Sequence, residues 1–165
     1  SDGRLAVLGG RLASVLGLPL GATGLAAGPA APPLAPDASG RLALVVCGAH
    51  LSGLPLNGQL TERGGRLLRA TSTATCYRFY ALPGGPPHRP GLIRQAEGGA
   101  AIEVEVWSLP LDQVGSFLAG IPAPLGLGSV ELADGTWAKG FICEGFAAEG
   151  ARDITHLGGW RAFVA

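Results

Sequence analysis

Residues 45–57, which read VVCGAHLSGLPLN, decide the fold of this chain. They complete a continuous apolar run over residues 42–47 that stops at Gly48, and such a run is typical of a central strand buried on both faces. The loop that follows contains glycine and proline, and it leaves backbone N–H groups free at the end of the sheet, where an anion can bind. We therefore expect a small-molecule site around residues 48–57.

His50 lies in the middle of this loop. Its imidazole, with an unperturbed pKa of about 6.5, can both take and give a proton near neutrality. A single loop histidine is also a common structural hydrogen-bonding group, and Asn57 could have the purely structural role of capping or turning the chain. For both residues a structural role and a role in the site therefore stay open. Glu103 and Glu105 could supply a carboxylate, but on a half-exposed strand we expect both to be solvated.

Patterns of β-forming residues continue along most of the chain. They predict strands over residues 67–75, 76–82, 101–109 and 160–164, and a hairpin from residues 129–132 and 136–144. Residues 111–118 predict a short helix that Pro110 introduces. The 28 glycines and 13 prolines favour short elements joined by tight turns and exclude a helical bundle. About six strands with one or two short helices are expected.

The first 40 residues follow a different pattern. Residues 2–18 carry leucine and valine at helical intervals, whereas residues 21–40 consist largely of Gly, Ala, Pro and Leu, as in a linker. The surface against which the helix packs would then belong to another part of a longer parent chain. The sequence contains no Met and does not open on a signal peptide, which we also expect of a piece cut from a longer protein.

Composition limits the function classes. Acidic and basic residues balance at 12 each, which leaves no positive surplus for binding nucleic acid. The apolar runs are shorter than the roughly 18 residues that a membrane span requires, so no membrane partner is expected. Cys47, Cys76 and Cys143 are odd in number and widely spaced, which predicts reduced core thiols and a cytoplasmic location. No pair of His or Cys residues has metal-ligand spacing, so neither a metal nor another cofactor is expected, and His88 and His156 are predicted at the surface.

The loop and the segments after it resemble a known family. Residues 46–60 are similar to the opening signature of the C-terminal domain of allophanate hydrolase. The likeness continues through YRFYALP (77–83), PGL (90–92), IPAPLG (121–126), WAKGF (137–141), DIT (153–155) and GGWR (158–161), so it covers nearly all of residues 41–165. Residues 1–20 resemble the final helix of the amidase domain that precedes this domain in that enzyme, and residues 21–40 would be the linker.

The strand–Gly–loop–Asn layout of residues 46–57 is also similar to the loop of γ-glutamyl cyclotransferase-like proteins. This resemblance implies an α+β fold, a small mixed β-barrel with a few short helices. Those cyclotransferases carry a catalytic Glu in a Glu-Gly-x-Pro setting, whereas the matching stretch here is Ala119-Gly120-Ile121-Pro122. Cyclotransferase chemistry on a γ-glutamyl amine is therefore the least favoured alternative.

The resemblance to allophanate hydrolase implies a reaction. The C-terminal domain of that enzyme is associated with the breakdown of N-carboxycarbamate, a small dicarboxylate, to carbon dioxide and ammonia in urea degradation. By motif position His50 is the expected catalytic residue, a general acid that protonates the nitrogen. The substrate-binding residues implied are Gly48, Ala49, Leu51, Asn57 and Lys139. The Ser-Ser-Lys machinery of the amidase is absent from this sequence, so allophanate hydrolysis itself is not expected here.

A second function class stays open beside this enzymatic one. The domain could be a non-catalytic scaffold that orders or dimerises the amidase, with a loop inherited from a fold that once did other chemistry. The expected partners are therefore a small dicarboxylate, the amidase domain of the parent chain and a second copy of the parent enzyme in a homodimer.

Overall fold

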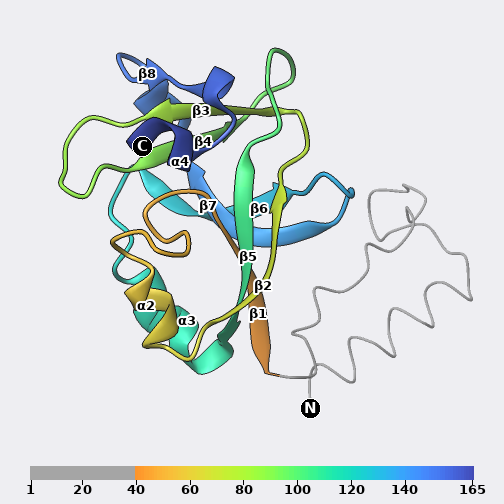
Figure 1. The fold of residues 1–165 in the computed structure, drawn as a ribbon, viewed down its shortest axis with the longest axis vertical. Helices are drawn as coiled ribbons and strands as arrows, with labels where there is room; N and C mark the ends of the chain where they lie inside the picture. The colour runs from red at the N-terminus through yellow and green to blue at the C-terminus, as the bar shows by residue number, and fades with distance from the viewer. Residues whose placement is uncertain (1–39) are drawn as a thin grey trace, which may run out of the picture. The chain divides into compact units, whose positions relative to one another are not determined.

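The computed structural model describes residues 40–165, which Figure 1 shows as a ribbon. The predicted tail helix, residues 1–20, and residues 21–39 of the predicted linker lie outside the described residues. The described part contains a five-stranded sheet of order β2-β5-β1-β7-β6 and a three-stranded sheet of order β4-β3-β8. No helix within residues 40–165 is long and apolar enough to cross a bilayer.

The elements of the described part are short. The strands are β1 (Arg41–Val46), β2 (Arg66–Ser72), β3 (Tyr77–Ala81), β4 (Pro90–Arg94), β5 (Glu103–Pro110), β6 (Leu125–Glu131), β7 (Trp137–Cys143) and β8 (Arg152–Asp153). The helices are α2 (Gly58–Thr61), α3 (Leu111–Leu118) and α4 (Trp160–Val164), with the 3-10 turns η2 (Gly145–Ala148) and η3 (Thr155–Leu157). The predicted α+β class with a few short helices is confirmed, and α3 has the predicted bounds.

Strand β1 lies at the centre of the larger sheet, as its apolar run predicts. It pairs antiparallel with β5 on one side and parallel with β7 on the other. Leu44, Val45 and Val46 are each exposed by 1% or less, so the end of the strand is covered on both faces. In Figure 1 the loop after β1 lies between α2 and α3 on one side and β3, β4 and α4 on the other. The sequence that follows β1 therefore enters the middle of the domain.

The larger sheet curls but does not form a closed barrel. Its two edge strands, β2 and β6, approach each other just beyond their ends, where Thr73 and Leu132 form an isolated bridge. The Ala74 amide donates to the Glu131 carbonyl at 2.9 Å, and the Ala133 amide donates to the Ser72 carbonyl at 3.0 Å. The remaining edge of β2 has no strand beside it within the described residues. The expected small barrel is thus a sheet joined at one end only.

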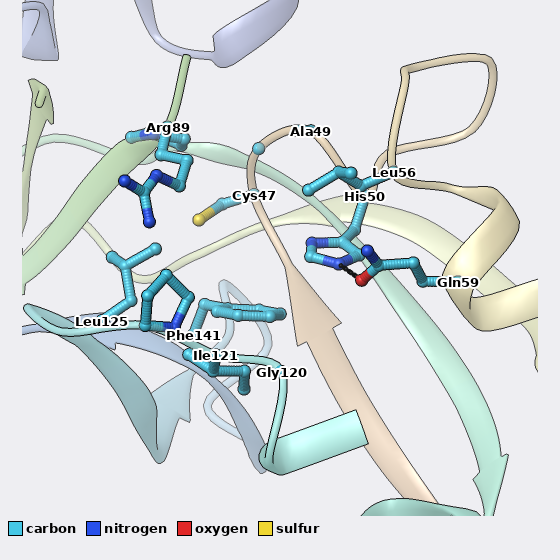
Figure 2. Close-up of a pocket in the computed structure, with 13 residues that line it drawn as sticks. Cys47, Ala49, His50, Leu56, Gln59, Arg89, Gly120, Ile121, Leu125 and Phe141 are labelled. Atoms are coloured by element: carbon cyan, nitrogen blue, oxygen red, sulfur yellow. Dashed lines mark hydrogen bonds between the residues drawn. The ribbon is translucent and has the colours of Figure 1, made fainter. Parts of the chain in front are cut away.

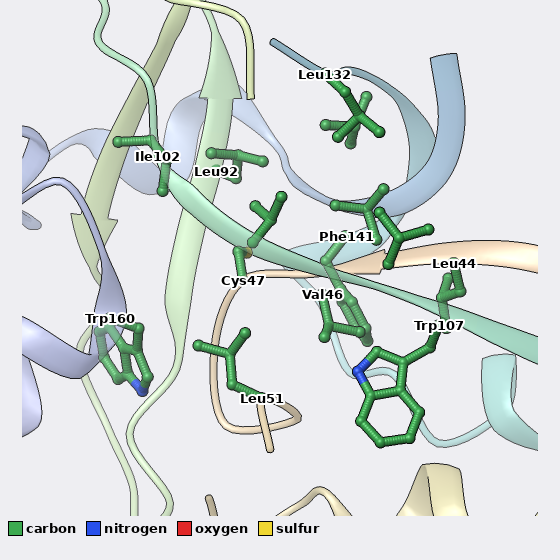
Figure 3. Close-up of a cluster of buried hydrophobic side chains, with 14 of the residues drawn as sticks. Leu44, Val46, Cys47, Leu51, Leu92, Ile102, Trp107, Leu132, Phe141 and Trp160 are labelled. Carbon is green, nitrogen blue, oxygen red and sulfur yellow. The ribbon is translucent and has the colours of Figure 1, made fainter. Parts of the chain in front are cut away.

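The main hydrophobic core fixes the loop after β1 to the sheets. Figure 3 shows Leu51 among core side chains that come from both sheets and from α4. Leu51 and Ile102, which precedes β5, are 0% exposed, and Leu92 of β4 is 1% exposed. Trp160 of α4 closes this core from the C-terminal end, with its ring 6.2 Å from that of Phe79. Burial of large apolar side chains on all sides holds the loop in one conformation.

Three sequence-based element predictions were wrong. Residues 160–164 form helix α4 rather than a strand, because Trp160 and Phe163, three residues apart, stack on one helical face with ring centroids 4.9 Å apart. Strand β4 went unrecognised because it begins at Pro90, a residue that strands tolerate at their first position. Strand β6 begins at Leu125 instead of Ser129, since its glycines conceal the pattern. Residues 40–165 contain eight strands, where about six were expected.

One glycine of the central sheet allows a direct test of its packing. A Cβ at Gly140 of β7 would lie 2.6 Å from the Cβ of Val45 and 3.0 Å from Val130 Cγ2. We expect Gly140→Ala to lower the free energy of unfolding by about 1–3 kcal/mol, because the close-packed sheet cannot yield. Gly126→Ala in β6 is the matched control, since a Cβ there meets nothing within 4 Å. Urea unfolding of both variants checks the prediction, and equal effects of the two would contradict it.

Candidate functional site

A cavity of about 70 Å³ opens beside the loop after β1 (Figure 2). Its walls are Cys47, Gly48, Ala49 and His50 of the loop, Leu56 and Gln59 at α2, Arg89 and Pro90 at β4, Gly120, Ile121 and Pro122 after α3, Leu125 of β6 and Phe141 of β7. This volume is far below the roughly 300 Å³ at which sites for drug-sized ligands begin, and a water molecule occupies about 30 Å³ in the liquid. The cavity therefore suits a very small molecule.

The imidazole of His50 is held from three sides. It stacks on Phe141 with ring centroids 5.0 Å apart and meets the edge of Phe117 at 5.3 Å. Its Nε2 lies 3.0 Å from Gln59 Oε1. Because that oxygen can only accept a hydrogen bond, Nε2 carries the proton and Nδ1 keeps a lone pair. In Figure 2 the ring nitrogen that is not bonded to Gln59 faces the side of the cavity where Arg89 lies.

Burial sets the protonation state of this histidine. Desolvation lowers the pKa of His50 below its usual range, and the hydrogen bond with Gln59 opposes this shift only in part. The imidazole is therefore neutral at neutral pH in the absence of a ligand. A negatively charged ligand in the cavity would raise that pKa again, since it favours the imidazolium form.

Arg89 is the cation of the cavity. In Figure 2 its guanidinium lies across the cavity from His50, with Cys47 between them, and within residues 40–165 it makes neither an ion pair nor a side-chain hydrogen bond. Its backbone is fixed, because the Leu82 amide donates to the Arg89 carbonyl at 3.0 Å. A Cβ at Gly48 would lie 2.5 Å from the ring of Pro90. Glycine at position 48 thus allows β4 to bring Arg89 up against the loop.

The loop itself offers hydrogen-bond donors. Within the described residues the amides of Ala49 and His50 have no hydrogen-bond partner, whereas the Leu51 amide donates to the Gly48 carbonyl at 2.9 Å. Two free amides, a guanidinium and an imidazole around one small space are suited to an anion. Among residues 40–165 no three His, Cys, Asp or Glu side chains gather in a way that could hold a metal ion.

The structure separates the predicted site residues into two groups. Gly48, Ala49 and His50 line the cavity, whereas Leu51 lies in the core and Asn57 supports the loop by donating from Nδ2 to the His50 carbonyl at 2.9 Å. Lys139 does not line the cavity either. Its Nζ lies 3.1 Å from Ser129 Oγ on the neighbouring strand.

Cys47 lines the cavity as a protonated thiol. The residue is 3% exposed, and burial, aided by the proximity of Cys143, raises the pKa of Cys47 to about 12. Because the thiolate is the nucleophilic form, this raised pKa disfavours Cys47 as a nucleophile at neutral pH. The three cysteines of the described residues are free thiols.

Glu103 and Glu105 differ from expectation and from each other. Glu105 was expected to be solvated, but it is 5% exposed because the loop after β1 folds over its face of β5. Burial would raise its pKa, yet hydrogen bonds from Ser52, Trp107 and Arg161 outweigh burial and lower the pKa of Glu105. Glu103 is half-buried, and neither carboxylate lines the cavity.

Sequence reasoning missed Gln59, Arg89 and Phe141. Gln59 belongs to residues 46–60, which carry the family resemblance. Its place at the start of α2, after the turn at Asn57, is the signal that could have predicted its contact with His50. Arg89 follows His88, which was predicted at the surface, and was not singled out, while Phe141 was taken only as part of the predicted hairpin strand. Of the other histidines, His88 and His156 are exposed, as predicted.

Fold and site together define an α+β domain with a small cavity lined by a histidine and an arginine beside the loop after its central strand. Comparison with known proteins supplies the family. The sequence pattern of the allophanate hydrolase C-terminal domain matches residues 42–165, and the chain belongs to this family. Over 131 residues it is 48% identical to the urea amidolyase of Saccharomyces cerevisiae, an alignment that covers 77% of this chain and 7% of the relative.

Two solved structures extend the comparison. The allophanate hydrolase of Kluyveromyces lactis is 46% identical, with a TM-score of 0.72 over 74% of this chain and 21% of that one. A uropathogenic E. coli-specific protein is 38% identical, with a TM-score of 0.70 over 75% of this chain and 95% of that one. The chain thus spans only 7% of the curated amidolyases that it matches but nearly the whole of the E. coli protein.

Proposed function

We propose that this domain binds the N-carboxycarbamate dianion in the cavity beside His50 and promotes its breakdown to carbon dioxide and ammonia. The observation that carries the proposal is the shared cavity of about 70 Å³ that Arg89 and His50 both line. One carboxylate would lie against Arg89 and the other against the amides of Ala49 and His50. A small dicarboxylate suits this set of donors, because the guanidinium can pair with one carboxylate while the amides donate to the other.

The chemistry follows from the protonation of His50. A dianion beside the neutral imidazole raises its pKa, so Nδ1 takes up a proton from solvent as the ligand binds. The imidazolium then gives this proton to the central nitrogen of the ligand. The bond from that nitrogen to one carboxylate carbon breaks, carbon dioxide leaves, and the electron pair stays on nitrogen. The product is carbamate, which takes a second proton and releases carbon dioxide and ammonia.

The wider context is part of the same proposal. The chain would be the C-terminal part of a longer enzyme whose preceding amidase domain supplies N-carboxycarbamate from allophanate during urea degradation. The names of the relatives, urea amidolyase and allophanate hydrolase, support this assignment. The free thiols Cys47, Cys76 and Cys143 support a reducing, cytoplasmic location.

The test is carbon dioxide release from freshly prepared N-carboxycarbamate, followed by stopped-flow with a pH indicator. We expect the chain to accelerate release over the spontaneous rate, and we expect malonate, a stable dicarboxylate of similar size, to inhibit competitively. A rate equal to the spontaneous one, in protein shown to be folded by circular dichroism, would contradict the proposal.

A scaffold role is the second candidate. Strand β2 is an edge strand, and Leu67 and Leu68 on it are 46% and 58% exposed. An exposed apolar edge favours pairing with another protein surface, such as a second copy or the amidase domain. The same assay separates the two candidates, because a scaffold leaves breakdown at the spontaneous rate.

The cavity disfavours the third function, cyclotransferase chemistry. Gly120, Ile121 and Pro122 line the cavity, so the stretch that aligns with the cyclotransferase motif lies where that motif would act. The motif's acidic position is Ala119, and no described residue that lines the cavity carries a carboxylate. A general base for a γ-glutamyl amine is therefore missing from the cavity wall.

A further inference from the structure

Glu105 of β5 is a buried carboxylate whose hydrogen bonds converge on the loop that carries His50. Its Oε2 accepts from the Ser52 amide at 2.8 Å, from Ser52 Oγ at 2.9 Å and from Trp107 Nε1 at 3.0 Å. Its Oε1 accepts from Arg161 Nη2 at 2.8 Å. The carboxylate thus accepts four hydrogen bonds, three of them at Oε2, and all four donors belong to residues of the loop, β5 and α4.

Arg161 ties the same point of the loop to the C-terminal helix α4. Its Nη1 donates to the Ser52 carbonyl at 2.9 Å, while Nη2 reaches Glu105. Ser52, two residues after His50, is therefore held at its amide, its hydroxyl and its carbonyl. On the other side Asn57 holds the His50 carbonyl, so the backbone around the imidazole is fixed from both directions.

This arrangement costs free energy that stability alone does not require. Taking the Glu105 carboxylate out of water is expensive, and the Arg161 side chain that pairs with it stays 38% exposed, so the ion pair recovers only part of that cost. Well-packed apolar side chains often stabilise a core as well as such a pair does. The strands around Glu105 are already rich in such side chains: Val104 and Val106 are 0% and 4% exposed. The particular effect of the charges is to fix the place and direction of one loop.

We propose that Glu105 is a positioning residue for His50, and that Arg161 of α4 completes the support. Held through Ser52, the imidazole keeps the Nε2–H tautomer that faces Gln59 and directs Nδ1 into the cavity. Supporting groups of this kind orient the residues that contact a ligand, and their loss typically weakens binding or activity by about 10- to 100-fold. The inference rests on the proposed function only for its effect on ligand binding.

The decisive variant is Glu105→Gln, with Glu103→Gln as its matched control. Both glutamates are on β5 and both contact Arg161. The Glu103 contact is a 3.3 Å ion pair with Arg161 Nε, its side chain is 44% exposed, and among the described residues it makes no side-chain hydrogen bond to the loop. In the ligand-free chain, ¹⁵N NMR of the His50 ring is expected to show the Nε2–H tautomer in wild type and in Glu103→Gln. Glu105→Gln is expected to show a mixture of tautomers.

Malonate binding by calorimetry gives the second readout. We expect about 10-fold weaker binding for Glu105→Gln and less than a 2-fold change for Glu103→Gln. If Glu105→Gln does not fold, Arg161→Lys takes its place, since an ammonium cannot reach Glu105 and Ser52 together and should shift both readouts in the same direction. Wild-type ring signals and affinity in a folded Glu105→Gln or Arg161→Lys protein would overturn the inference. Failure of wild type to bind malonate would overturn the proposed function instead, while the NMR comparison still decides the positioning role.

Discussion

His50→Gln is expected to lower the acceleration of N-carboxycarbamate breakdown by about 100- to 10,000-fold, the usual contribution of a positioned acid or base. Glutamine retains polarity and much of the volume beside Phe141, but it cannot take a proton from solvent and pass it to nitrogen. Stopped-flow measurement of carbon dioxide release gives the rate. His156→Gln is the control, because that histidine is exposed and does not line the cavity.

An equal loss in both variants would point to a general effect on folding, and full activity of His50→Gln would remove His50 from the mechanism.

The pH dependence of the reaction rate is a further prediction. Since burial lowers the pKa of His50, the imidazolium is scarce in the free protein, and kcat/KM should rise as the pH falls towards that lowered pKa. His50→Gln should lose this rise.

The free energy of unfolding is expected to fall as the pH falls. In the unfolded chain His50 takes up a proton at about pH 6.5, whereas in the native state it does so only at lower pH, so below about pH 6.5 this histidine destabilises the native state.

The sequence predicted the parts of the fold that depend on local pattern. The apolar run before Gly48 forms the central strand, and residues 111–118 form α3. The segment 160–164 was misassigned because a run of five residues fits both periods, and only the packing of Trp160 against Phe163 and Phe79 decides for a helix.

The candidate site was predictable only where its residues are contiguous. Gly48, Ala49 and His50 follow one another, so the loop pattern revealed them together. Glu105 alternates with buried valines, which is the pattern of an outward-facing residue. No feature of the neighbouring sequence indicates that the loop after β1 covers it. This coverage depends on a long-range contact, because Ser52 and Glu105 are 53 positions apart in the sequence.

The basic residue at the cavity differs from the one expected from the sequence. The expected cation for the carboxylates was Lys139, whereas the cation that lines the cavity in the structure is Arg89. The reason lies in tertiary packing, because the ring of Pro90 fits against Gly48, where a Cβ would come within 2.5 Å. Arg89 and Pro90, which the sequence analysis did not assign to the site, thus form one wall of the cavity.

Arg89→Gln is therefore expected to weaken malonate binding by about 10- to 100-fold, in line with the loss of one or two charge-assisted hydrogen bonds. Glutamine keeps a donor near the same place but lacks the positive charge that a dianion requires. Lys139→Gln, in which the same charge is removed beside Ser129, is expected to change the affinity less than 2-fold. Calorimetric titration of both variants with malonate measures the difference. The reverse order, with Lys139 carrying the affinity, would mean that the ligand binds outside the cavity between His50 and Arg89, and the assignment of the carboxylates to the Ala49 and His50 amides would fall with it.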